Sequence, residues 1–146
     1  MERRDAIVGM GILAGAVLSK AAMAEHEEHQ HHQQGGGKYD SLIASAAGCV
    51  KTGQACINHC FMLLGDGDKS MASCARSVNQ LVSVCATLQA LASAESKLLP
   101  QYAKVAAEFC KACEDECRKH DKKHEQCRDC AEACAKCAKE CQAVGA

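Results

Sequence analysis

The sequence predicts an all-α fold, an up-down-up-down antiparallel four-helix bundle with a cysteine-lined core. The 146 residues include a single proline and the glycines are clustered, so long stretches remain in which a helix can continue unbroken. No stretch shows the alternation of apolar and polar residues that is typical of a strand. The thirteen cysteines recur at helical spacings, in the positions that a bundle assigns to its core.

Turn and capping residues divide residues 38–146 into four expected helices, which form one domain. The helices are expected over residues 39–64, 68–94 (or from 70), 99–119 and 125–144. Gly65-Asp66-Gly67 suits the end of the first helix, and Asp68 or Ser70 suits the N-cap of the second. Pro100 is tolerated in the first turn of the third. Because the connections are short, consecutive helices are expected to be antiparallel neighbours.

At 3.6 residues per turn, the cysteines of each expected helix fall on one stripe. They are Cys49, Cys56 and Cys60 in the first helix, Cys74 and Cys85 in the second, Cys110, Cys113 and Cys117 in the third, and Cys127, Cys130, Cys134, Cys137 and Cys141 in the fourth. In the fourth helix the steps alternate between three and four residues, which is the heptad spacing of a core seam. Lysine and glutamate occupy the opposite face.

A structural module stabilised by disulfides is one alternative for so many cysteines. Residues three or four apart on a helix have Cβ atoms about 5–6 Å apart, whereas a disulfide needs about 3.5–4.5 Å. Bridges between helices remain possible, but thirteen is an odd number and many thiols would be left unpaired. The spacing therefore favours thiols that bind metal.

Several cysteine pairs have the spacing C-x-x-x-C, as Cys113 and Cys117 do, and could hold a two-coordinate ion between them. Thiolates are soft ligands that select Cu(I), Zn(II) or iron–sulfur clusters. One Cu(I) per thiolate leaves the core neutral, whereas Zn(II) with four thiolates leaves two negative charges at each site, which is costly in a dry bundle. We therefore expect multiple Cu(I) ions, about one per cysteine. A thiol-rich zinc or iron–sulfur protein is the alternative.

The composition argues against several other functions. A net charge of −1 favours neither nucleic acid nor an anionic membrane as a partner. The C-x-x-C pairs, such as Cys110 and Cys113, fall inside expected helices without the strand–helix–strand context of thiol redox enzymes. No combination of nucleophile, base and orienting group is evident, so we expect no enzymatic activity.

The expected topology gathers soft ligands at one end of the bundle, where the first helix ends and the fourth begins. Three residues there are candidate metal ligands besides the cysteines, namely His59, Met62 and Met71. Imidazoles and thioethers bind Cu(I) more weakly than thiolates do, so they could pass ions inward. Gap filling in the core is an equal alternative for the two methionines. His120 and His124 lie at the same end and could be ordinary loop residues.

Residues 1–24 have the features of a signal peptide. Arg3-Arg4 supply a charged start, an apolar stretch follows, and Ala22-Met23-Ala24 is a small-x-small cleavage site. The paired arginines resemble a twin-arginine signal, although Glu2 and Asp5 depart from it, and an ordinary secretion signal is the alternative. The apolar stretch is shorter than the roughly 20 residues that span a bilayer. We therefore expect an exported, periplasmic protein with no membrane span in its mature form.

Residues 25–37 are expected to form a disordered, His-rich tail. Glutamate, glutamine and glycine surround four histidines, and such a polar segment cannot form a core. The histidines could collect copper or zinc loosely, but a solvated linker explains them as well.

The pattern of cysteines resembles the bacterial copper storage proteins, particularly their exported branch. Three segments carry the likeness: CINHCFMLLGDGDKSMASC at Cys56–Cys74, CKACEDECRKH at Cys110–His120, and CRDCAEACAKCAKEC at Cys127–Cys141. Members of that family are four-helix bundles, commonly tetrameric, whose core thiols hold many Cu(I) ions. The resemblance therefore implies copper storage that limits toxicity and supplies copper enzymes through an acceptor protein. It also implies that His59, Met62 and Met71 are non-thiol ligands near the open end.

The resemblance implies a homotetramer, but composition and spacing do not. No apolar seam is evident on the outer faces of the expected helices, so the sequence leaves the oligomeric state open.

Overall fold

The computed structural model describes residues 36–146. Within these residues the chain forms a four-helix bundle and no strand. The elements are α1 (Asp40–Gly65), a short 3-10 helix η1 (Lys69–Met71), α2 (Ala72–Ser93), α3 (Leu99–Arg118) and α4 (Glu125–Gly145). The predicted signal peptide over residues 1–24, and the predicted tail as far as residue 35, lie outside the described residues.

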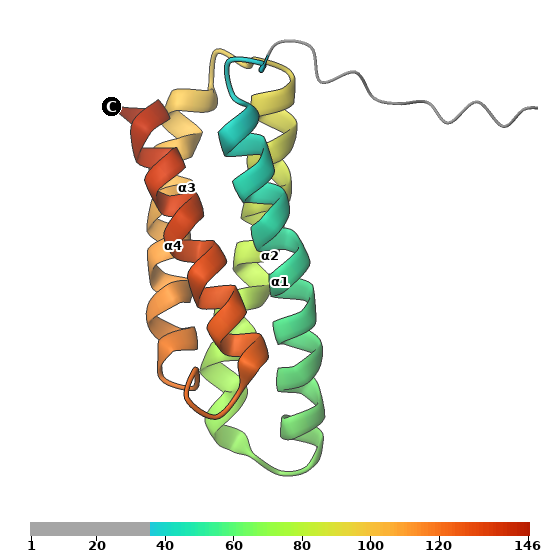
Figure 1. Ribbon diagram of the computed structural model, residues 1–146. Helices are drawn as coiled ribbons and strands as arrows, with labels where there is room; N and C mark the ends of the chain where they lie inside the picture. Colours follow the sequence, from blue (N-terminus) through green and yellow to red (C-terminus); the bar gives the residue numbers. More distant parts are fainter. Residues whose placement is uncertain (1–35) are drawn as a thin grey trace, which may run out of the picture. The chain divides into compact units, whose positions relative to one another are not determined.

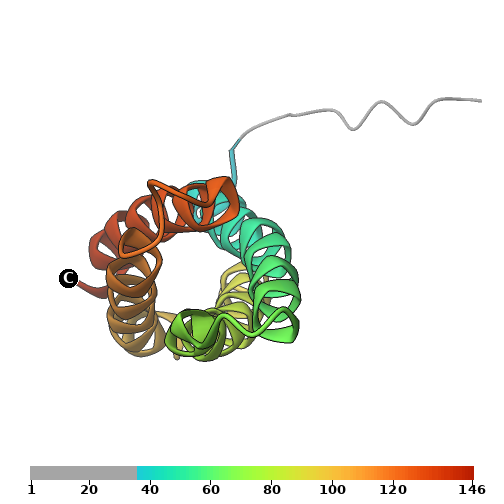
Figure 2. The same cartoon turned by 90° about the horizontal axis from the view of Figure 1, so that it is seen from below.

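The four helices form a ring in which consecutive helices run antiparallel (Figure 1). α1 contacts α2 and α4, and α3 contacts the same two helices. Among the described residues, the diagonal pairs α1–α3 and α2–α4 make no contact between Cα atoms within 8 Å. The view along the bundle axis shows this ring directly (Figure 2). The predicted up-down-up-down bundle is confirmed.

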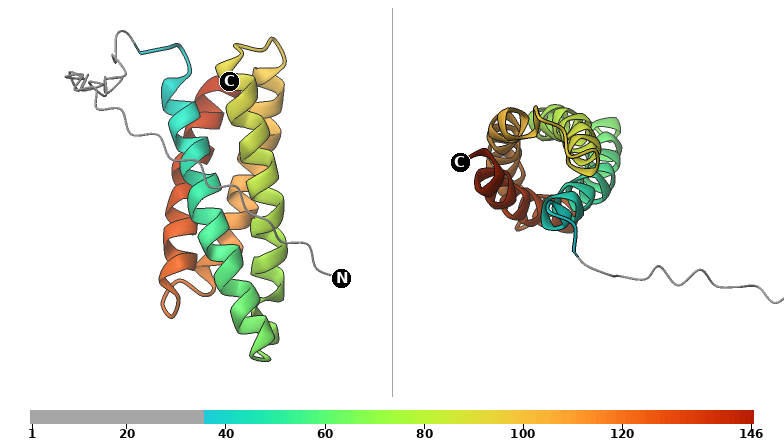
Figure 3. Two further views of the ribbon diagram at one scale, coloured as in Figure 1. Left: turned by 90° about the vertical axis from the view of Figure 1, so that its right-hand side faces the viewer. Right: turned by 90° about the horizontal axis from the view of Figure 1, so that it is seen from above.

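The two ends of the ring differ in composition. We call one the histidine end, where α1, η1, α2 and the α3–α4 connection meet, and the other the leucine end, where α2 and α3 are joined. Figure 2 views the histidine end, and the right-hand panel of Figure 3 views the leucine end. Leu42, Leu88 and Leu99 are buried toward the leucine end, whereas Met71 is buried at the histidine end.

The turn between α1 and η1 depends on a glycine. Gly67 has a φ of 94°, in the left-handed region that a residue without a Cβ atom adopts most easily. Asp68 then accepts hydrogen bonds from the backbone N–H and the hydroxyl of Ser70 at 3.0 and 2.6 Å. This aspartate caps η1, so the second helix begins with a 3-10 turn before α2.

α1 and α2 approach closely at Gly53. A Cβ atom at this position would lie 2.7 Å from Cγ2 of Val82 on α2, which is closer than two carbon atoms can pack. The missing side chain therefore sets the spacing between the two helices.

The core between the helices is built from small side chains. Every cysteine side chain is fully buried, and alanines such as Ala103, Ala106 and Ala131 are buried in the same core. None of the helices in residues 36–146 is both long and apolar enough to cross a bilayer.

Candidate metal centre

All thirteen cysteines are buried and carry free thiols. All but Cys141 belong to groups in which the sulfur atoms lie within 4.8 Å of one another. We name these the four-helix group (Cys49, Cys85, Cys110, Cys137), the histidine-end group (Cys56, Cys60, Cys74, Cys127), the bridging group (Cys56, Cys117, Cys130) and the α3–α4 group (Cys113, Cys130, Cys134).

The four-helix group takes one cysteine from each helix of the bundle. Its four sulfurs therefore meet on the bundle axis, because each helix turns one cysteine toward the centre of the ring. Four buried thiols in one layer, with no other polar side chain in the group, form a soft site for a metal ion.

The other three groups share cysteines and are continuous. Cys56 belongs to the histidine-end group and to the bridging group, and Cys130 belongs to the bridging group and to the α3–α4 group. An ion held by one group therefore shares a sulfur with the next. Thiolate exchange along this path needs no passage through an apolar layer.

The shortest sulfur contacts join different helices. Sγ of Cys74 lies 3.7 Å from Sγ of Cys117, and Sγ of Cys56 lies 3.8 Å from Sγ of Cys127. The C-x-x-x-C pair Cys113–Cys117 is 3.9 Å apart, at the spacing that the sequence predicts for one helical turn. These separations are far above the roughly 2.05 Å of a disulfide bond, so the contacts are hydrogen bonds between thiols.

One thiol in each group has a lowered pKa. Hydrogen bonding from Cys117 lowers the pKa of Cys74, hydrogen bonding from Cys113 lowers that of Cys130, and hydrogen bonding from Cys110 lowers that of Cys137. The histidine-end group contains Cys74, the four-helix group contains Cys137, and the other two groups share Cys130. Each group therefore has one sulfur that its neighbours favour as a thiolate.

Most other core thiols have a raised pKa. Hydrogen bonding with Cys117 raises the pKa of Cys56, hydrogen bonding with Cys113 raises that of Cys134, and burial adds to both. The pKa is also raised at Cys49, Cys85, Cys110, Cys117, Cys127 and Cys141. A metal binds thiolates, so these protons must leave when it binds.

Two imidazoles meet beside the histidine-end group. Nε2 of His59, on α1, lies 2.9 Å from Nδ1 of His124, the residue before α4. Both rings are half-buried. Burial lowers the pKa of His124, and positive charge on His59 and His120 lowers it further. A neutral imidazole keeps a lone pair for a metal ion. The sequence places His124 at this end but gives no sign of its contact with His59, which depends on how α1 and α4 pack.

The two candidate methionines differ in exposure. Met71 is completely buried in the core, whereas the side chain of Met62 is 67% exposed. Met71 can therefore face the thiols, and Met62 lies on the outer surface of the histidine end.

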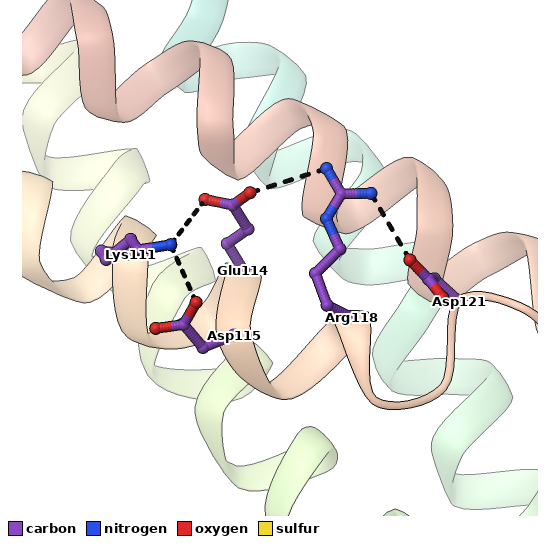
Figure 4. Close-up of polar contacts among 5 residues, drawn as sticks. All are labelled: Lys111, Glu114, Asp115, Arg118 and Asp121. Atoms are coloured by element: carbon purple, nitrogen blue, oxygen red, sulfur yellow. Dashed lines mark hydrogen bonds and ion pairs between the residues drawn. The ribbon is translucent and has the colours of Figure 1, made fainter.

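A chain of ion pairs orders the connection that carries His120 and His124 (Figure 4). Arg118 lies 3.5 Å from Glu114 and 3.6 Å from Asp121, and it links the last turn of α3 to the loop. Lys111 lies 3.5 Å from Glu114 and 2.8 Å from Asp115. Solvent-accessible pairs of this kind contribute about 0–1 kcal/mol each, so the network orients the loop more than it stabilises the fold.

Sequence comparison connects this core to cysteine-rich bacterial proteins. The profile of a family described as copper storage protein matches residues 34–146. A Bacillus subtilis (strain 168) protein described as the uncharacterized cysteine-rich protein YhjQ is 31% identical over 100 residues. The match covers 67% of this chain and 90% of that protein.

Solved structures of copper storage proteins have the same fold. Apo copper storage protein 3 from Bacillus subtilis matches with a TM-score of 0.65 and 27% identity, over 73% of this chain and 98% of that chain. A Cu(I)-bound protein, BsCsp3, matches with the same TM-score at 25% identity, over 73% and 97% of the two chains. The Streptomyces lividans copper storage protein loaded with 10 copper equivalents matches with a TM-score of 0.67 and 28% identity, over 73% and 83%.

The prediction of an exported, periplasmic protein is wrong. A similar structure, with a TM-score of 0.65 and 29% identity over 72% of this chain and 89% of that chain, is a cytosolic copper storage protein from Streptomyces lividans. The segment that suggested export, residues 1–24, lies outside the described residues.

Proposed function

Since this chain belongs to the copper storage protein family, we propose that it stores multiple Cu(I) ions on the thiolates of its bundle core. The observation that carries the proposal is the arrangement of the sulfur atoms. Every cysteine but Cys141 lies in a buried group of three or four sulfurs, and three of the groups share members. Soft thiolates select Cu(I) over harder cations. The stored ions number about one per cysteine at full load.

Charge balance supports Cu(I) as the ion that fills all the groups. One Cu(I) per thiolate neutralises the core, so many ions can be stored without leaving net charge in a dry interior. The four-helix group would also fit one tetrahedral Zn(II), since four sulfurs are the ligand set that zinc prefers. Zinc at every group would leave several uncompensated charges.

The protein's role is binding and release rather than catalysis. Stored copper would be kept from toxic reactions and passed to copper enzymes through an acceptor protein. Assembly of the chain into a homotetramer is part of the same proposal, and it rests on the resemblance to other copper storage proteins.

The histidine end is the proposed route by which copper enters and leaves. His59 is half-buried and directly precedes Cys60 of the histidine-end group, and Met71 is buried at the same end. Weaker ligands placed before stronger ones pass an ion inward. Met62 would act at the outer surface, where its thioether is accessible.

Replacing His59 by alanine is expected to slow copper uptake without lowering the final capacity. The imidazole lies outside the thiol groups, so its loss removes a step in transfer but no storage site. Stopped-flow absorption of the Cu(I)–thiolate bands would give the rate, and the end point would give the capacity. The Met62→Ala variant is expected to act in the same direction. Uptake at the wild-type rate in both variants would contradict this route.

The storage function itself is tested by an anaerobic titration of the reduced apo protein with Cu(I), in the presence of a competing chromogenic chelator. We expect tight binding of about a dozen ions per chain, with thiolate-to-copper absorption in the ultraviolet and no visible colour. Saturation at one or two ions would refute a store. A parallel titration with Zn(II) that filled every group, or a visible iron–sulfur spectrum, would favour the alternative metals.

A further inference from the structure

Two of the four sulfur groups contain four cysteines, and these two quartets are built differently. The histidine-end group includes Cys56 and Cys60, which lie four residues apart on α1 and form a C-x-x-x-C pair. The four-helix group takes a single cysteine from each helix of the ring (Figure 2), so it contains no such pair. A pair on one helix suits a two-coordinate ion, whereas four sulfurs that converge from four helices suit a tetrahedral one.

The four-helix group has the dimensions of a tetrahedral site for a single ion. Zinc–sulfur bonds of about 2.3 Å give a tetrahedron whose sulfur atoms are about 3.8 Å apart. The four sulfur atoms already lie within 4.8 Å of one another. No sulfur–sulfur distance therefore has to shorten by more than about 1 Å when the group closes on an ion. All four ligand atoms are sulfur, as in many structural zinc sites.

Cys141, the one cysteine outside the four groups, interacts with this site. It hydrogen-bonds to Cys110 and Cys137, which are two of the four ligands. These contacts and burial raise the pKa of Cys141, so its thiol keeps the proton and acts as the donor. Hydrogen bonding with Cys110 and with Cys141 lowers the pKa of Cys137. Cys141 therefore supports negative charge on the sulfurs of the four-helix group.

Charge limits how many divalent ions the core can hold. A divalent ion with four thiolates carries two negative charges, which are costly in a dry interior. At the four-helix group the S–H donor of Cys141 offsets part of this cost, because hydrogen bonds to charged groups are the stronger ones. The thiols that contact Cys56 of the histidine-end group differ, since Cys117 and Cys130 belong to further groups themselves. The core therefore has one site suited to a divalent ion.

We propose that the four-helix group binds one tetrahedral divalent cation, Zn(II), and that Cys141 is a positioning residue for its ligands. The ligands are Cys49, Cys85, Cys110 and Cys137, and their four protons leave as the ion binds. The ion links all four helices and so stabilises the copper-free bundle. Cu(I) competes for the same sulfurs and replaces the divalent ion as the store fills. The inference concerns the copper-free protein, so it does not depend on copper storage.

The test is an anaerobic titration of the reduced, copper-free, full-length protein with Co(II), because tetrahedral Co(II) bound by four thiolates absorbs strongly in the visible. We expect this absorption to saturate at one Co(II) per chain and to disappear when one equivalent of Zn(II) is added. Cys85→Ala should abolish the four-sulfur spectrum, since Cys85 belongs to the four-helix group alone. Cys60→Ala is the matched control and should keep the spectrum, because Cys60 is equally buried and belongs to the histidine-end group alone.

Thermal unfolding gives an independent measure of the link between the helices. One equivalent of Zn(II) should raise the melting temperature of the wild type and of Cys60→Ala, but not that of Cys85→Ala. Circular dichroism of the metal-free variants establishes that both are folded. A wild-type protein without the four-sulfur Co(II) spectrum would overturn the proposal, as would the same spectrum and stabilisation in Cys85→Ala as in Cys60→Ala.

The role of Cys141 has its own test. Cys141→Ala should weaken Co(II) binding by about 10–100-fold, which is the usual effect of losing a hydrogen bond to a metal ligand. Its spectrum at saturation should stay that of the wild type, because all four ligands remain. Cys141→Ser should recover most of the affinity, since a hydroxyl group also donates. Wild-type affinity in Cys141→Ala, or a changed spectrum at saturation, would overturn the positioning role.

Discussion

Among the core thiols, Cys130 and Cys141 differ most in the number of sulfur groups to which they belong. Cys130 belongs to both the bridging and the α3–α4 groups, whereas Cys141 belongs to none, and both side chains are fully buried. The two cysteines also lie on the same helix, α4. They are therefore matched in burial and backbone, and differ in the number of sulfurs around them.

Cys130→Ala is expected to reduce copper capacity more than Cys141→Ala. Cys130→Ala removes a ligand from two groups and breaks the continuity between them, whereas Cys141→Ala removes a ligand from none of the four groups. The loss of one buried sulfur should cost the folded apo protein about 1 kcal/mol in either variant, so stability serves as the internal control. Anaerobic Cu(I) titration gives the capacities. Equal losses of capacity would show that membership of the groups does not determine storage.

The raised pKa values of the thiols set an alkaline limit on the stability of the apo protein. The pKa is raised at eight cysteines, including Cys49, Cys56 and Cys134, and lowered at Cys74, Cys130 and Cys137. Above about pH 8.5 the thiols of the unfolded chain lose protons that most folded thiols keep. The unfolded state then binds fewer protons, and the free energy of unfolding falls as pH rises.

Urea denaturation of the reduced apo protein should therefore give a lower free energy of unfolding at about pH 9.5 than at about pH 7.5. The expected cause is proton loss from the unfolded chain, so a variant with fewer core cysteines should lose less stability over the same interval. A free energy of unfolding that stayed constant or rose with pH would contradict the directions assigned to these thiols.

Exposure separates the two candidate methionine ligands in a way that the sequence could not. Met62 and Met71 lie on either side of the α1–η1 turn, and periodicity does not extend through a turn. The cysteines were predictable as core residues because each follows the period of a single helix. The contact between His59 and His124 was not, since it depends on two segments 65 residues apart in sequence.

At the scale of a single helix, α1 contains two glycines, Gly48 and Gly53, that differ in the space around them. Gly48 has nothing within 4 Å of the position that a Cβ atom would occupy, whereas at Gly53 that position is 2.7 Å from Cγ2 of Val82. Both glycines lie within α1, so an alanine at either position gains the same helical propensity, about 1 kcal/mol. The two sites therefore differ in packing against α2.

We expect Gly48→Ala to raise the melting temperature and Gly53→Ala to lower it. The gain in propensity is unopposed at Gly48, while overpacking at Gly53 costs about 1–3 kcal/mol because the branched side chain of Val82 is stiff. Thermal unfolding followed by circular dichroism measures both. A Gly53→Ala variant as stable as Gly48→Ala would mean that α1 and α2 are not held at the spacing described.

The helix ends agree closely with the sequence prediction. The expected helix over residues 99–119 corresponds to α3 at Leu99–Arg118, and the one over residues 125–144 corresponds to α4 at Glu125–Gly145. Prolines, glycines and capping side chains act locally, so the helix ends that they determine can be predicted from the sequence. The exception is the separate 3-10 turn η1 before α2. Asp68 and Ser70 both suit an N-cap, and in the structure Asp68 is the residue that caps η1.

For the whole molecule, the sequence predicted which residues are buried but not which meet. The sulfur groups join cysteines from two, three or four helices, and their membership depends on how far each helix is shifted along its neighbours. A heptad pattern specifies a face of a helix, not this shift.

Anomalous X-ray diffraction at the copper absorption edge, from crystals loaded anaerobically with Cu(I), is the most direct test of storage on the core thiolates. Copper peaks are expected between sulfur atoms in all four groups, with the ions of the histidine-end, bridging and α3–α4 groups forming one continuous chain through the shared cysteines. Copper confined to surface histidines, with the core thiols unoccupied at saturation, would contradict the account.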